Sequence, residues 1–111
     1  MPILLIMNQA KGPLTINATF TAPTDGPACF VVSGSVWSAS ANQTIGFSVE
    51  LDGVPIGSAQ IFSNAASTHR DVVPGYIPVT LTHAQHTVAL VPLNAATTSD
   101  SNDRFNVVLA Y

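Results

Sequence analysis

The sequence predicts an all-β protein, an antiparallel β-sandwich or jelly roll of seven to eight strands. Three observations indicate this class: short segments alternate apolar and polar residues with period two, an Asp–Gly pair joins two of them, and turn-forming residues recur between them. No long amphipathic helix or internal repeat interrupts the pattern. We therefore expect residues 14–111 to form a single domain, preceded at residues 1–13 by an apolar arm or a first strand.

The strongest signal is a central hairpin with the sequence TIGFSVELDGVPIGSAQIF. Apolar residues occupy every second position before the Asp–Gly pair at 52–53, a dipeptide favoured in two-residue hairpin loops. Such a loop places Leu51 opposite Val54 and Val49 opposite Ile56, so that one face of both strands is apolar. A shift of one residue would turn that apolar set outward, so the turn and the pattern support the same register.

The same reasoning extends to the other strands. Gly34 lies inside a β-forming run, which predicts a bend there. Pro55 has no N–H to offer a further strand, which predicts a local sheet edge or a bulge. The segment 63–71 is rich in poor helix formers, so a single helical turn is the less favoured alternative to a loop. Turn chemistry is expected at residues 8–13, and further strands at residues 3–7, 14–20, 29–38, 76–81, 86–93 and 105–111.

Charged residues are scarce: they make up 8% of the chain, where about 25% is usual. The polar surface must therefore consist mainly of Ser, Thr, Asn and Gln, which do little to keep molecules apart. This composition favours a chain that hides surface in a subunit interface, or one that works attached to something larger. The only cations, Lys11, Arg70 and Arg104, are too scattered to bind nucleic acid or an anionic membrane surface.

Cys29 is the only cysteine, so no disulfide forms within the chain. It stands between Ala28 and Phe30 in an apolar run, which favours a buried structural thiol over a nucleophile. The N-terminal run MPILLIM lacks a basic region and is too short for a signal peptide or a membrane span. We therefore expect no signal peptide, and a location in a virion or the cytoplasm.

The polar segment 67–71 holds residue types that serve elsewhere as nucleophile, base and acid. Because neighbours in an extended chain point to opposite sides, they do not form a catalytic triad merely by adjacency. We expect a loop pinned by a pair between Arg70 and Asp71, with His69 packed or hydrogen-bonded beneath it. Loops on rigid sandwiches commonly carry recognition, so His69, Arg70 and Asp71 are candidate binding residues.

Two sets of residues are weighed as metal ligands. His69, His83 and His86 offer imidazoles, and a metal on a symmetry axis with one histidine per subunit stays open. Asp100 and Asp103 offer oxygens in a polar loop, but their spacing lacks the features of a strong calcium motif. Asx side chains also cap turns without an ion, and we favour that interpretation. We predict no resident cofactor or metal ion.

The chain resembles small jelly rolls of the C1q/tumour-necrosis-factor-like kind over residues 29–111. The segments that carry the resemblance are FVVSGSVWSAS, LDGVPIG, YIPVTLTHAQHTVAL and FNVVLAY. Modules of this kind are compact trimers that pack apolar sheet faces around a threefold axis. The same architecture is found in trimeric decoration (cement) proteins of phage capsids and in some bacterial lectins. The resemblance therefore implies a homotrimer, and it places no binding residue on this chain.

The favoured hypothesis is a non-enzymatic structural protein, a homotrimer that decorates a larger assembly such as a phage capsid shell. Scarce charge, an apolar N-terminal segment and the lack of a recognisable catalytic set motivate it. The residues expected to bind the partner are Ile3, Leu4, Leu5 and Ile6.

The alternative is a lectin-like module that binds glycans through loops 63–71 and 94–103, the second of which carries Asp100 and Asp103. Calcium stays open as part of this alternative. A sugar-stacking platform of Trp37, Tyr76 and Tyr111 is also weighed, although aromatic residues on strands more often belong to a core or an interface. An enzyme is the least favoured of the three hypotheses.

Overall fold

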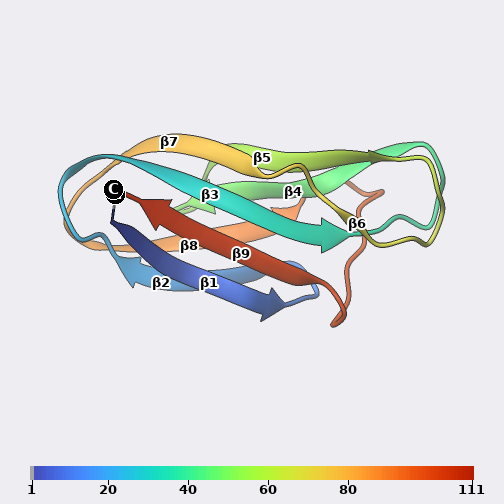
Figure 1. Ribbon diagram of the computed structural model, residues 1–111, viewed down its shortest axis with the longest axis horizontal. Helices are drawn as coiled ribbons and strands as arrows, with labels where there is room; N and C mark the ends of the chain where they lie inside the picture. The colour runs from blue at the N-terminus through green and yellow to red at the C-terminus, as the bar shows by residue number, and fades with distance from the viewer. Residues whose placement is uncertain (1) are drawn as a thin grey trace.

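A computed structural model describes residues 2–111, which form nine strands in two antiparallel sheets (Figure 1). The confirmed class is therefore an all-β sandwich, as the alternation of apolar and polar residues predicts. No helix in residues 2–111 is long and apolar enough to cross a membrane. The strands are β1 (Ile3–Lys11), β2 (Ile16–Thr21), β3 (Gly26–Val36), β4 (Gln43–Leu51), β5 (Val54–Ser63), β6 (Arg70–Asp71), β7 (Gly75–Leu81), β8 (Gln85–Pro92) and β9 (Arg104–Ala110).

The chain passes repeatedly between the two layers. One sheet has the order β1-β9-β3, and the free edge of β3 pairs with β7 along its first part and with β6 at its end. The other sheet has the order β2-β8-β4-β5. This distribution of the eight longer strands is the double Greek key of a jelly roll. The two-residue strand β6 is the element that the pattern did not predict, because it is too short to show a period.

The core lies between the sheets and is built from the inward positions of each strand. Phe47 of β4 and Phe105 of β9 meet edge to face, with ring centroids 5.6 Å apart, and they join the two layers. The largest fully buried apolar side chains are Phe30, Ile45, Phe47, Leu90, Phe105 and Leu109. Their positions follow the period of two on which the strand predictions rest.

The central hairpin is confirmed, but its predicted register holds only beside the turn. Leu51 pairs with Val54, whereas Val49 pairs with Gly57, because a bulge shifts the register at Pro55 and Ile56. Val54, although it pairs with Leu51, is 61% exposed and does not belong to the core. Pro55 cannot donate a ladder hydrogen bond, which explains the bulge, and β5 is also the edge strand of its sheet.

The favoured loop in the segment 63–71 is confirmed: turns precede the short strand β6, and there is no helical turn. Two local predictions are wrong. β1 continues to Lys11 through residues that were expected to turn. Gly34 causes no register shift between β3 and β9; instead, the ring of Phe105 occupies the space where a side chain would lie. The glycine therefore permits a close approach instead of a bend.

Candidate functional site

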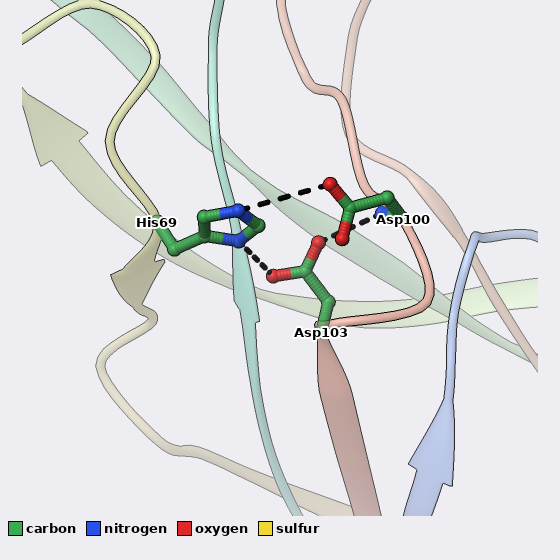
Figure 2. Close-up of side chains that lie close together, drawn as sticks. All are labelled: His69, Asp100 and Asp103. Carbon is green, nitrogen blue, oxygen red and sulfur yellow. Dashed lines mark hydrogen bonds and ion pairs between the residues drawn. The ribbon is translucent and has the colours of Figure 1, made fainter.

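Two loops that are distant in the sequence meet at the end of the sandwich where β3 ends, on the right of Figure 1. One loop connects β5 to β6 and carries His69, and the other connects β8 to β9 and carries Asp100 and Asp103. Backbone hydrogen bonds to residues 37–38, just after β3, hold both loops in place. Figure 2 shows His69 facing both aspartates, with one ring nitrogen directed at each carboxylate.

His69, Asp100, Asp103 and Ser35 form a polar cluster. Asp103 is its centre and is fully buried. Its Oδ1 accepts hydrogen bonds from the Ser35 hydroxyl and from His69 Nδ1, both at 2.7 Å. Its Oδ2 accepts one from the backbone N–H of Asp100 at 2.8 Å. A buried carboxylate needs such donors because it has left water. Asp103 therefore ties β3 and both loops to one point.

His69 is the exposed member of the pair, with 42% of its side chain accessible. The hydrogen bond to Asp103 raises its pKa above 6.5, and the negative charges of Asp103 and Asp100 act in the same direction against a partial desolvation. Its Nε2 lies 3.7 Å from Asp100 Oδ2, and its ring centroid lies 6.0 Å from that of Trp37. The imidazole is thus biased toward its charged form.

This geometry does not form a catalytic triad. The serine hydroxyl in the cluster, Ser35 Oγ, donates to the carboxylate and has no hydrogen bond to the imidazole. A triad requires the imidazole between nucleophile and acid, so that it can remove the proton of the nucleophile. In the cluster described here, Ser35 and His69 share the acid, which is an arrangement for holding loops.

An open groove of about 650 Å³ begins beside the cluster and crosses the outer face of the β1-β9-β3 sheet. The pairing of the strands places the polar side chains of the groove opposite one another, in two rows that run across the strands. Ser35 lies opposite Asp71 in one row, and Ser33 lies opposite Asn106 in the next. The groove is lined by Gln9, Ser33, Gly34, Ser35, Asp71, Val72, Pro74, Asn102, Arg104 and Asn106.

The structure brings together some of the predicted site residues and separates others. His69, Asp100 and Asp103 form the cluster, and Asp71 lines the groove. The predicted pair between Arg70 and Asp71 is wrong: Arg70 Nη2 donates to Asn64 Oδ1 at 3.2 Å. The two residues are neighbours on β6, and neighbouring strand side chains point to opposite faces.

Sequence reasoning missed the groove residues on β3 and β9. Ser33 and Ser35 alternate with buried Val32 and Val36 in β3, and Asn106 follows buried Phe105 in β9. This alternation is visible in the sequence, and it indicates that the three polar side chains face outward. That they lie side by side depends on the pairing of β3 with β9, whose paired residues at the groove are 71 or more positions apart in the sequence, and no local pattern indicates that pairing.

The cluster offers one nitrogen and two carboxylates within 4.8 Å, the kind of donor set that binds a divalent cation. Both oxygens of Asp103 already accept hydrogen bonds from protein groups, and Asp100 Oδ1 accepts the N–H of Asn102 at 2.8 Å. These are the bonds of Asx-capped turns. The donor atoms thus fit a self-contained polar network better than a metal centre.

The three histidines do not converge. His69 lies at the end of β3, whereas His83 and His86 lie by the turn between β7 and β8, next to the start of β3. They cannot bind one ion within a single chain.

The three aromatic residues weighed as a platform are also spread along β3. Trp37 follows the end of this strand, whereas Tyr76 pairs with Val31 and Tyr111 follows the partner of Cys29. At about 3.3 Å per residue, six residues separate Trp37 from the position of Tyr76 by about 20 Å. A single sugar cannot stack on both rings.

The N-terminal segment forms β1, an edge strand paired with β9. Leu4 and Ile6 pack against the core, whereas Ile3 and Leu5 are 59% and 57% exposed. Of the four residues expected to bind a partner, only these two present an apolar surface.

No family model and no curated protein matches the chain, but several solved structures share its fold. A CBM35 domain from Cellvibrio japonicus Abf62 has a TM-score of 0.60 at 11% identity, covering 99% of this chain and 93% of that one. A family 35 carbohydrate-binding module from Clostridium thermocellum has a TM-score of 0.55 at 12% identity, covering 96% and 86%.

A similar likeness extends to part of a larger protein. A β-glucosidase from Paenibacillus barengoltzii has a TM-score of 0.61 at 11% identity over 99% of this chain. The chain spans about a tenth of the length of that enzyme, since 10% of it is covered. At such identities the likeness concerns the fold alone. The chain therefore has the β-sandwich fold of carbohydrate-binding modules.

Proposed function

We propose that this protein is a carbohydrate-binding module, and that it binds sugar where loops 63–71 and 94–103 meet the groove. The observation that carries the proposal is the groove itself, an open concavity lined by amide, hydroxyl and charged side chains beside a fully buried anchor, Asp103. Sugars present many hydroxyl groups, and these are recognised by polar side chains that a rigid scaffold holds in position.

The fold supports this proposal as an analogy. Modules described as carbohydrate-binding share the arrangement of both sheets over nearly the whole chain. The rigid network around Asp103 adds a physical reason, because side chains that are already ordered lose less entropy when a ligand binds. The binding hypothesis needs no catalytic group, which agrees with the arrangement of Ser35 and His69.

The test is a glycan array with the purified protein, followed by calorimetry on the best ligand. Asn102→Ala removes an exposed amide from the groove, and loss of one hydrogen bond of about 1 kcal/mol should weaken binding about fivefold. The matched control is Asn17→Ala, an exposed asparagine on β2 in the other sheet. Equal weakening in both variants, or no glycan bound at all, would contradict the proposal. Binding that is lost with EDTA would add a cation to the site.

A second candidate is the homotrimeric decoration protein. It is favoured by the exposed Ile3 and Leu5 on edge strand β1 and by the low fraction of charged residues. Sedimentation should give a trimer that the double variant Ile3→Ser, Leu5→Ser dissociates. Substitution is preferable to deletion of this segment because β1 pairs with β9. A stable monomer at high protein concentration would exclude this candidate. The solved structures reported above are of carbohydrate-binding modules and an enzyme, so the decoration role stays a prediction.

A further inference from the structure

Resting on the proposed function, we infer that the groove binds an internal segment of a neutral polysaccharide, and binds it through hydrogen bonds instead of ring stacking. Three properties of the groove carry this inference. They are the direction in which it runs, the balance of its charges and the chemistry of its lining.

The first property is direction. The lining residues come from β1, β9, β3 and β6, and from the segments that follow β6 and precede β9, so the groove runs across the strands and not along them. Neighbouring strands lie about 4.8 Å apart, so four of them span about 14 Å, enough for more than one sugar ring. The groove is open, with the edge strand β1 at one of its ends and the two-residue strand β6 at the other. A chain can therefore continue past both ends, which a pocket for a terminal sugar would prevent.

The second property is charge. The lining contains one carboxylate, Asp71, and one guanidinium, Arg104, so their charges cancel. Arg104 also donates from Nη1 to the carbonyl of Ser101 at 2.7 Å, which commits part of its hydrogen-bonding capacity to the loop. Recognition of an acidic sugar would need an uncompensated cation with free donors. The groove accordingly favours a ligand without net charge.

The third property is the lining itself. Its uncharged polar side chains are two serines, two asparagines and one glutamine, and none of the described residues that line it is aromatic. Asn106 is already positioned, since its Oδ1 accepts the N–H of Gln9 at 2.9 Å and its Nδ2 donates to Ser33 Oγ at 3.3 Å. The amides of Gln9 and Asn102 are exposed and free of side-chain hydrogen bonds within the described residues. These two amides are the donors and acceptors that we assign to the ligand.

The experiment uses neutral oligosaccharides of increasing length, with a matched series of the same length that contains uronic acids. Affinity for the neutral series should rise with length, stay unchanged when the reducing end is reduced to an alditol, and depend little on salt. The double variant Gln9→Ala, Asn102→Ala should lower affinity by about 10-fold or more, since two hydrogen bonds of about 1 kcal/mol each are lost. Asn17→Ala, on β2 in the other sheet, is the matched control, and it should change affinity by less than about twofold. Thermal unfolding of each variant verifies the fold.

The outcomes separate this inference from the proposed function. If no glycan in either series binds, the proposed function fails and the inference with it. If glycans bind but the acidic series is preferred, or a single terminal sugar suffices, or the double variant binds normally, the inference fails alone. Binding that follows length and is weakened by the double variant but not by Asn17→Ala supports both.

Discussion

Two histidine–aspartate pairs lie at opposite ends of the sandwich and use the same 2.7 Å contact in opposite ways. At the end with the groove, the aspartate is buried and the histidine is exposed: Asp103 has no accessible side chain, and His69 has 42%. At the other end, where the hairpin turns, Asp52 is 49% accessible and His86 only 11%. In each pair, the buried partner makes further hydrogen bonds to the surrounding structure: Asp103 to Ser35 and Asp100, and His86 to Thr82.

The pair at the hairpin turn is a complete clamp. His86 Nδ1 donates to Asp52 Oδ2 at 2.7 Å, and its Nε2 donates to the carbonyl of Thr82 at 2.9 Å. Because both acceptors lack a hydrogen, the ring satisfies them together only when both nitrogens carry protons. Asp52 Oδ1 also accepts the N–H of Thr87 at 2.8 Å. This pair therefore joins two turns and uses both nitrogens of its imidazole.

The pair beside the groove is instead an anchor with one accessible side. Asp103 holds β3 and both loops, while the imidazole of His69 faces Asp100 and the solvent. The comparison teaches that the buried carboxylate fixes two loops to β3, whereas the buried imidazole fixes one turn to another. Each of the following predictions tests that distinction.

The largest expected effect is the loss of stability when Asp103 is replaced, compared with the loss when Asp52 is replaced in a separate variant. Asp103→Ala leaves a histidine, a serine and a backbone N–H without their buried acceptor, so the free energy of unfolding should fall by about 3–5 kcal/mol. Asp52→Ala should cost about 1 kcal/mol, because Asp52 is half exposed. Urea unfolding measures both. Equal losses would mean that burial of the carboxylate does not distinguish the two pairs.

The next effect is the pH dependence contributed by His86. The hydrogen bond with Asp52 raises the pKa of His86 above 6.5, followed in importance by the bond to Thr82. A raised histidine pKa stabilises the fold fully below 6.5 and loses that contribution as the pH rises through the folded value. The stability difference between the wild type and His86→Gln should therefore be larger at about pH 5.5 than at about pH 9. A stability difference that does not change with pH would contradict the role of protonated His86 in binding Asp52 and Thr82.

The pair of His86 and Asp52 also affects the stability of the fold at acid pH. The hydrogen bonds from His86 and from the backbone of Thr87 lower the pKa of Asp52 below 3.8. A lowered aspartate pKa stabilises the fold above 3.8, and this contribution disappears as the pH falls through the folded value. Asp52→Asn should therefore flatten the acid limb of the stability curve. Thermal unfolding from about pH 2 to about pH 5 measures it, with the exposed Asp25→Asn as a comparison.

A smaller, spectroscopic effect distinguishes the other histidine. Trp37 is the only tryptophan, and its ring lies 6.0 Å from that of His69. A charged imidazolium at this distance interacts with the indole, so fluorescence should change as the pH rises through the raised pKa of His69. His69→Gln should abolish the step and His86→Gln should leave it. A step that follows His86 instead would contradict the assignment.

The smallest effect is expected at Asp100. Its carboxylate lies 3.7 Å from His69 Nε2 and is 40% accessible, so Asp100→Asn should change stability by less than about 0.5 kcal/mol. The midpoint of the Trp37 fluorescence titration should nevertheless move to lower pH, because one negative charge beside the imidazole is gone. An unchanged midpoint would leave Asp103 as the only residue that acts on His69.

The sequence by itself determined the class of the fold, the turn at Asp52 and Gly53 and most of the strands. These depend on neighbours in the chain: both turn residues have positive φ, 52° and 82°, which an Asp–Gly pair tolerates in a type I′ turn. It also determined that the loops carry His69, Asp100 and Asp103. Only the tertiary structure decided that these three residues meet, that a bulge beside Pro55 shifts the register of the hairpin, and that β3 and β9 place their serines and asparagine side by side. The physical reason is that such contacts depend on the register between distant strands, which the buried faces select together and no local period records.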